Sequence, residues 1–102
     1  MCYYSYTYTQ WELHMKTEKL IAKLEKMFPE SKPVCTMEWN GRLGGIWFRG
    51  SEDVLADGER VFDNYNMDWN YGMNPRIDRV LDEAGWYAEP YDAGTCMAYP
   101  IN

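Results

Sequence analysis

Residues 74–99 read NPRIDRVLDEAGWYAEPYDAGTCMAY, which predicts a short helix followed by a β-hairpin. Asn74 before Pro75 is a favourable pair for an N-cap and a first helical turn, and Gly85 is a typical C-terminal stop. The apolar residues between them recur at helical spacing. These residues are Ile77, Val80, Leu81 and Ala84. We therefore expect an amphipathic helix whose apolar stripe faces a core.

The residues after this helix predict two strands joined by a tight connection. Residues 86–91 and 95–99 are rich in aromatic and apolar side chains, and they flank Asp92-Ala93-Gly94. Such an arrangement is typical of a hairpin. Pro90 cannot donate a backbone hydrogen bond, so it indicates an edge position.

The first 29 residues predict a strand and then a long helix. Tyr4, Tyr6 and Tyr8 alternate with other residues over 3–8, which is the period of a half-buried strand. Thr9 and Glu12 form a capping-box pattern. Apolar residues then recur at helical spacing until Pro29 stops the helix. They are Leu13, Leu20, Ile21, Leu24, Met27 and Phe28.

Two further segments lie between these helices. Residues 34–49 place apolar and aromatic side chains on both sides of Asn40-Gly41 and Gly44-Gly45, which predicts another hairpin. Residues 51–65 have apolar side chains at helical spacing, with Ser51 as a possible cap, and we expect a helix in which Gly58 faces the core. A hairpin around Asp57-Gly58 is the alternative for this segment.

The predicted order is β-α-β-β-α-α-β-β over a single domain, residues 1–102. It corresponds to an α+β fold: a small antiparallel sheet of about five strands with two to three helices packed on one face. We expect nine residues of the helices to be buried. They are Leu20, Ile21, Leu24, Phe28, Val61, Phe62, Ile77, Val80 and Leu81.

The charge of the chain is unevenly distributed. Residues 1–51 contain seven Lys and Arg against five Asp and Glu, whereas residues 52–102 contain three against eleven. The net charge of −6 disfavours direct binding of nucleic acid or of an anionic membrane. The N-terminus has no secretory signal pattern, so we expect a cytoplasmic protein, in the host cell if it is encoded by a phage.

Residues suited to catalysis or metal binding are few. His14 is the only histidine, and it falls on a lysine-rich helix. The three cysteines, Cys2, Cys35 and Cys96, lack the spacing of metal ligands and are expected to be buried, reduced thiols. Residues 63–70 alternate oxygen-bearing side chains but lack the glycine and glutamate of a calcium loop. We therefore predict no catalytic residue, metal or cofactor.

The beginning of the chain bears on the enzymatic alternative. Met1-Cys2 followed by Tyr3-Tyr4 resembles the start of the abasic-site-binding SRAP proteins, and glutamine amidotransferases also begin with a cysteine. The resemblance implies a thiol nucleophile whose base is the α-amino group. It covers a few residues of a chain much shorter than those families.

The strongest candidate for a functional surface combines carboxylates with neighbouring aromatic rings. Carboxylates can present a negative array to a basic partner, and exposed aromatics favour protein interfaces. A solvated acidic helix face is the competing interpretation. The predicted partner-binding residues are Glu52, Asp53, Asp57, Glu59, Asp63, Tyr65, Asp68, Trp69 and Tyr71.

Two kinds of binding protein agree with these patterns. The acidic, aromatic-rich character resembles small phage and mobile-element inhibitors, including anti-CRISPR and anti-restriction proteins. This resemblance implies a non-enzymatic inhibitor that occludes the basic, nucleic-acid-binding surface of a partner protein. The sequence leaves the oligomeric state open, with a homodimer as one alternative. The alternative is a nucleotide-binding protein, with arginines beside the aromatics. The arginines considered are Arg42, Arg49, Arg60, Arg76 and Arg79. An enzyme of unrecognised type is a third hypothesis.

Overall fold

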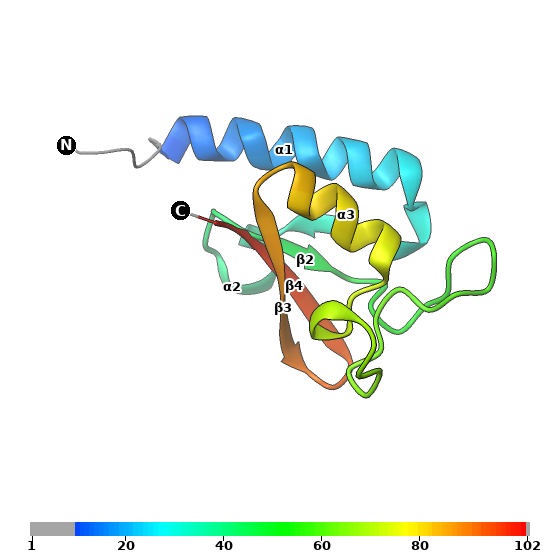
Figure 1. Cartoon of the computed structure of the whole chain (residues 1–102). Helices are drawn as coiled ribbons and strands as arrows, with labels where there is room; N and C mark the ends of the chain where they lie inside the picture. Colours follow the sequence, from blue (N-terminus) through cyan, green and yellow to red (C-terminus); the bar gives the residue numbers. More distant parts are fainter. Residues whose placement is uncertain (1–9, 102) are drawn as a thin grey trace.

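The computed structural model describes residues 10–101, which form an α+β fold (Figure 1). Its elements follow one another in this order: α1 (Gln10–Met27), η1 (Pro29–Ser31), β1 (Pro33–Cys35), α2 (Met37–Asn40), β2 (Ile46–Phe48), η2 (Asn70–Gly72), α3 (Pro75–Glu83), β3 (Trp86–Asp92) and β4 (Thr95–Pro100). The predicted helices before Pro29 and after Asn74 are confirmed. Thr9, the expected N-cap of the first helix, lies outside the described residues.

The strands form one antiparallel sheet in the order β1-β2-β4-β3. Within residues 10–101 the sheet has four strands, fewer than the predicted five, and the strand expected over 3–8 lies outside that range. The predicted hairpin of β3 and β4 is confirmed. Pro90 lies on an edge strand as expected, because among the described strands β3 pairs with β4 alone.

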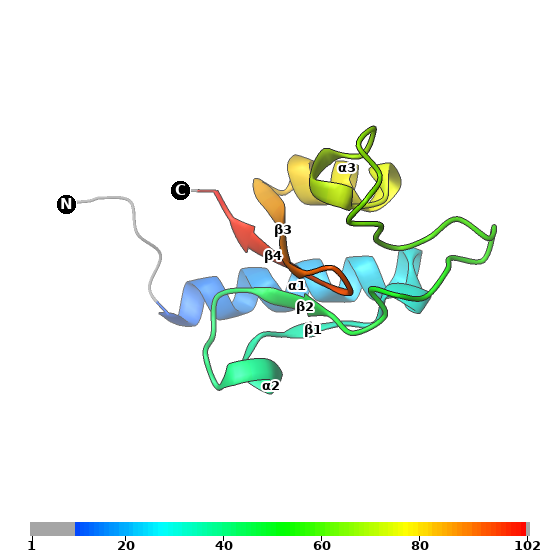
Figure 2. The same cartoon turned by 90° about the horizontal axis from the view of Figure 1, so that it is seen from below.

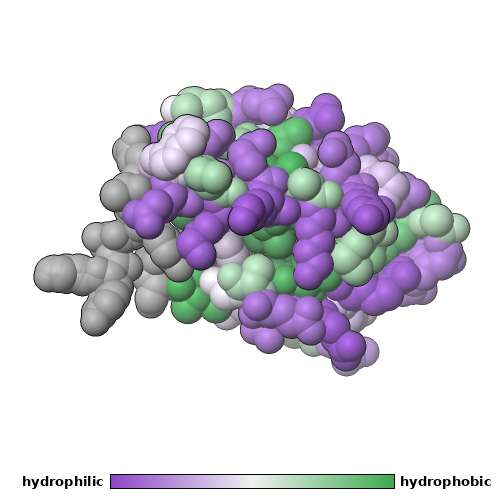
Figure 3. All heavy atoms as spheres, turned by 90° about the horizontal axis from the view of Figure 1, so that it is seen from above, coloured by the Kyte–Doolittle hydropathy of each residue, from purple (hydrophilic) through white to green (hydrophobic). Residues whose placement is uncertain are grey.

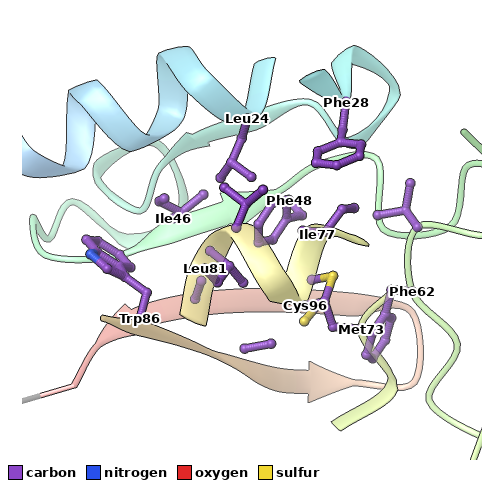
Figure 4. Close-up of a cluster of buried hydrophobic side chains, with 14 of the residues drawn as sticks. Leu24, Phe28, Ile46, Phe48, Phe62, Met73, Ile77, Leu81, Trp86 and Cys96 are labelled. Carbon is purple, nitrogen blue, oxygen red and sulfur yellow. The ribbon is translucent and has the colours of Figure 1, made fainter. Parts of the chain in front are cut away.

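The helices α1 and α3 share one core with the same side of the sheet. Alternate strand residues point toward these helices, and Figure 4 shows Ile46, Phe48 and Cys96 facing Leu24 and Leu81. Of the nine predicted core residues, Ile21 is partly buried and the others are buried. The strands lie in front of α1 in Figure 2, so this view shows the sheet side that α1 leaves uncovered.

The second helix, α2, contacts the opposite side of the sheet. It interrupts the predicted hairpin of residues 34–49, whose strands are confirmed as β1 and β2. Gly41 ends α2 with a φ of 77°, a left-handed conformation that suits glycine. Trp39 of α2 packs edge-on against Trp47, which points away from the core because its neighbours Ile46 and Phe48 point into it. The helices therefore do not all lie on one face.

The predicted helix over residues 51–65 is wrong. The segment is irregular, and Val54 and Arg60 form an isolated antiparallel bridge across a turn at Asp57-Gly58. A side-chain oxygen of Asp57 accepts a hydrogen bond from the Glu59 amide, and Gly58 is exposed with a φ of 88°. Local turn chemistry therefore prevails over the helical spacing, and the alternative hairpin is closer to the structure.

The side of the molecule that includes α1 is largely polar. Figure 3, viewed from above, shows hydrophilic side chains over much of this side, with apolar atoms visible between them. Lys16, Lys19, Lys23 and Lys26 of α1 are all exposed. Within residues 10–101, no helix combines the length and the apolar character needed to cross a bilayer.

Candidate functional surface

All nine predicted partner-binding residues lie on one long segment, residues 52–71, which we call the acidic loop. It connects β2 to α3 and runs away from the sheet before returning beside it (green to yellow-green in Figure 1). Its carboxylates are not arranged as a helical array, because the helix predicted there is absent. The position of each carboxylate depends on its own contacts.

Two of the predicted carboxylates are paired within the protein. Asp53 lies 3.0 Å from the ammonium of Lys32, and Asp57 lies 2.5 Å from the guanidinium of Arg76. All four side chains are about half exposed, so each pair contributes roughly 0–1 kcal/mol. The pairs connect the first part of the acidic loop to Lys32, which follows η1, and to α3. They also reduce the charge that Asp53 and Asp57 could offer to a partner.

The start of the acidic loop is anchored to the sheet through Ser51. Its buried hydroxyl donates to the Phe48 carbonyl at 2.5 Å and accepts from the Cys96 amide at 3.0 Å. The next residue, Glu52, lies beside Gly94 in the turn between β3 and β4. The acidic loop therefore begins next to the tip of that hairpin.

The second part of the acidic loop exposes its large side chains. Asp63 accepts a hydrogen bond from the Tyr65 amide, and Asn66 accepts one from the Asp68 amide. These contacts fold the chain into successive turns in which Tyr65 is 76% and Met67 is 93% exposed. No group of three His, Cys, Asp or Glu side chains within residues 10–101 is placed to hold a metal ion.

Tyr71 has an unusual backbone conformation. Its φ of 52° and ψ of 28° lie in the left-handed region, which costs a residue with a side chain roughly 1–2 kcal/mol. Gly72 follows with a φ of 76°, and a Cβ there would lie 2.7 Å from the carbonyl oxygen of Asp63. This tight turn leaves the Tyr71 side chain 62% exposed, whereas Trp69 is half-buried.

The sequence analysis missed a second aromatic surface, on the side of the sheet away from α1. We call it the outer sheet face and define it by Trp47, Tyr87, Glu89, Tyr91, Met97 and Tyr99, with Trp39 of α2 packed against it. The available signal was the alternation of Tyr87, Glu89 and Tyr91 in β3, since alternate strand residues share a face.

The side chains considered for catalysis that the structure describes are Cys35, Cys96 and His14. Cys35 and Cys96 are buried, as predicted, and burial raises the pKa of the Cys96 thiol to about 12. Such a thiol is protonated at neutral pH and is a weak nucleophile. His14 lies beside Trp11 on α1, with ring centroids 6.1 Å apart. Cys2 lies outside the described residues.

The arginines considered for nucleotide binding are only partly brought together. Arg76 and Arg79 line a cavity of about 550 Å³ between α1 and α3, together with Lys23. The other lining residues are Met27, Phe28, Pro75, Val80 and Glu83. The basic groups expected around a phosphate are therefore present there, without the Tyr and Trp rings expected for base stacking.

Comparison with known proteins finds no matching family model, no similar curated protein and no similar solved structure. The function is therefore inferred from the residues themselves.

Proposed function

We propose that this chain is a non-enzymatic acidic binding protein whose acidic loop docks on the basic surface of a partner protein. The observation that carries the proposal is the grouping of exposed Tyr65, Met67 and Tyr71 with the carboxylates of Asp63 and Asp68 on one irregular segment. Aromatic side chains supply much of the binding energy in protein interfaces, and carboxylates select a basic partner.

The ion pairs within the protein refine the proposed set of residues. Asp53 and Asp57 support the loop, because Lys32 and Arg76 already neutralise them. Glu59 and Asp68 are exposed and make no ion pair within residues 10–101. These two carboxylates, with the exposed aromatics, are the groups that a partner would contact first.

The partner class that agrees best with this surface is a nucleic-acid-binding protein. Carboxylates spaced along an irregular loop can occupy the positions of phosphates in a basic groove, so that the inhibitor and the nucleic acid compete. The acidic, aromatic-rich character of the chain resembles that of small phage and mobile-element inhibitors of host nucleases and defence complexes, and a cytoplasmic location agrees with this role. We place this chain in that functional class as a proposal.

The decisive experiment reverses two charges on the loop and two elsewhere. Glu59→Lys with Asp68→Lys changes the loop, and Glu18→Lys with Glu25→Lys makes the same change in net charge on exposed positions of α1. Each tagged protein is used to capture partners from a host lysate at physiological salt, and bound proteins are identified by mass spectrometry. Duplex DNA is then added to the captured complex.

The proposal requires a nucleic-acid-binding protein that the wild type and the α1 variant capture and the loop variant loses. DNA must also release that protein from the complex. Capture that survives the loop reversal, or a complex that excess DNA leaves intact, contradicts the proposal.

A second proposed function is binding of a small phosphate-bearing ligand in the cavity between α1 and α3. The observation in its favour is the presence of Lys23, Arg76 and Arg79 around about 550 Å³, a size typical of ligand sites. A thermal-shift screen against nucleotides tests it. An increase in Tm that Arg79→Gln abolishes supports this function, whereas unchanged Tm values reject it.

A further inference from the structure

Glu89 lies on the outer sheet face, on its edge strand β3, among aromatic side chains. It points to the same side of the edge strand β3 as Tyr87, two residues before it. Tyr91 lies at an irregularity in the register between Pro90 and Asp92, and its contact with Trp39 places its ring on this face. Across the sheet, Glu89 is opposite Met97, which is in turn opposite Trp47. The carboxylate therefore lies at the end of a row of apolar side chains.

The surrounding rings form a connected cluster. Trp39 packs edge-on against Trp47, with centroids 4.8 Å apart, and against Tyr91, with centroids 5.1 Å apart. Trp47 and Tyr91 come from strands on either side of β4, so Trp39 spans the central strand. Met97 of that strand is only 2% exposed, which agrees with cover by these rings.

The rings that border this cluster remain accessible. Tyr91 is 62% exposed and meets Trp39 at an interplanar angle of 71°, so the two rings form an open corner. On the other side of Glu89, the rings of Tyr87 and Tyr99 lie 6.3 Å apart. A flat group can lie on the face of one ring while it touches the edge of its neighbour.

The charge of Glu89 has no counter-charge within the described part of the chain. The two salt bridges of this part of the chain join other residues, Lys32 to Asp53 and Arg76 to Asp57. Arg49, the basic residue that follows β2, forms no salt bridge with Glu89. The Tyr87 hydroxyl donates one hydrogen bond to Glu89 at 3.0 Å. A carboxylate has about four acceptor positions, so most of them remain open to a further donor.

We propose that Glu89 and the rings around it bind an arginine side chain of a basic partner protein. A guanidinium is planar, can donate two parallel hydrogen bonds to a carboxylate and stacks on Tyr and Trp faces. The ammonium of a lysine is not planar and cannot stack on a ring in this way. The negative charge of Glu89 would repel a nucleic-acid phosphate. This inference deepens the proposed function and rests on it for the existence of a basic partner.

The test uses a fluorescein-labelled peptide of alternating arginine and glycine, and measures its affinity by fluorescence anisotropy at physiological salt. Glu89→Gln keeps the size of the side chain, and Tyr91→Ala removes one exposed ring. Glu25→Gln on α1 is the matched control, because it removes one exposed charge from another surface. Unchanged circular dichroism and Tm show that each variant is folded.

We expect Glu89→Gln and Tyr91→Ala each to raise the Kd by about three- to tenfold, and Glu25→Gln to change it less than twofold. A peptide with citrulline in place of arginine, and one with lysine, should bind more weakly. Equal effects of Glu89→Gln and Glu25→Gln would overturn the site. Tighter binding of single-stranded RNA than of the arginine peptide would instead indicate a nucleic-acid surface.

The outcomes separate this site from the acidic loop. If Glu89→Gln leaves peptide affinity unchanged while the loop reversal abolishes partner capture, the arginine site is wrong and the proposed function stands. If the loop reversal leaves capture intact while Glu89→Gln weakens the peptide, the loop proposal fails and the arginine site stands.

Discussion

The guanidinium of Arg76 in the first turn of α3 donates to the carboxylate of Asp57 at the tip of the turn in the acidic loop. The other Asp57 oxygen accepts the Glu59 amide, so one side chain both shapes the turn and connects it to a helix. Asp57 is therefore part of the internal structure of the loop, although the sequence analysis placed it in the partner-binding surface.

We expect the coupling between Asp57 and Arg76 to be small. A double-mutant cycle with Asp57→Asn and Arg76→Gln should give a coupling of less than about 1 kcal/mol in the free energy of unfolding, because both side chains are half exposed. Urea unfolding measures it, and added salt should reduce it further. A coupling well above this value would show that the pair is better shielded from solvent than its exposure indicates.

Asn74 should be far more important for stability than a typical N-cap. It is 1% exposed, accepts from the Arg76 amide at 2.9 Å and donates to the Arg60 carbonyl at 2.9 Å. Asn74→Ala should lower the free energy of unfolding by about 2–3 kcal/mol, because it removes the cap and also the partly buried hydrogen bond to the Arg60 carbonyl. Asn74→Ser keeps a cap acceptor, so chemical denaturation should give an intermediate loss.

Ser51 and Ser31 are two buried serines in similar local settings, so one serves as the control for the other. Each hydroxyl donates to the carbonyl three residues earlier, but only Ser51 also accepts a long-range bond, from the Cys96 amide. We expect Ser51→Ala to reduce the free energy of unfolding by about 2 kcal/mol and Ser31→Ala by about 1 kcal/mol or less. Equal losses would mean that the amide of Cys96 finds another acceptor.

The pKa of Tyr87 should depend on its hydrogen bond to the Glu89 carboxylate. The hydrogen bond to the Glu89 carboxylate raises the pKa of Tyr87 above its usual value of 10.0. The stabilising effect is therefore present below pH 10 and is lost as the pH rises through the higher native pKa. Glu89→Gln should return the pKa toward 10, as measured by NMR of ring-labelled tyrosine. Glu83→Gln on α3 should leave the Tyr87 curve unchanged.

Local signals in the sequence were sufficient to predict α1, α3 and the hairpin of β3 and β4. Helix α3 and the hairpin that follows were predicted because Asn74, Pro75 and Gly85 mark the ends of the helix and the strand residues flank a turn. Helix α1 was predicted from apolar spacing interrupted by Pro29. Each of these elements is specified by residues close to one another in the chain.

The errors arose where local patterns competed or where tertiary position decided the outcome. Residues 51–65 have helical apolar spacing, yet Asp57 and Gly58 form a turn that ends any helix there. The side chains of Val61 and Phe62 are buried as expected, although the backbone differs. Burial was therefore easier to predict than secondary structure in this segment.

The two surfaces differed in how far they could be predicted. Exposure of Tyr65 and Tyr71 was expected, because both were assigned to the partner-binding surface. The outer sheet face required knowledge of the strand order, since Trp47, Met97 and Glu89 become neighbours only when β4 lies between β2 and β3. Trp39 joins them from a helix that replaced part of a predicted hairpin.

The positions of two prolines affect how copies of this protein meet at high concentration. Pro33 begins one edge strand of the sheet, and Pro90 lies within the other. Neither has an amide hydrogen, so each interrupts the row of donors that a strand from a second molecule would need. The two edges are therefore poor templates for intermolecular β-sheet growth and aggregation, even though aromatic side chains are exposed nearby.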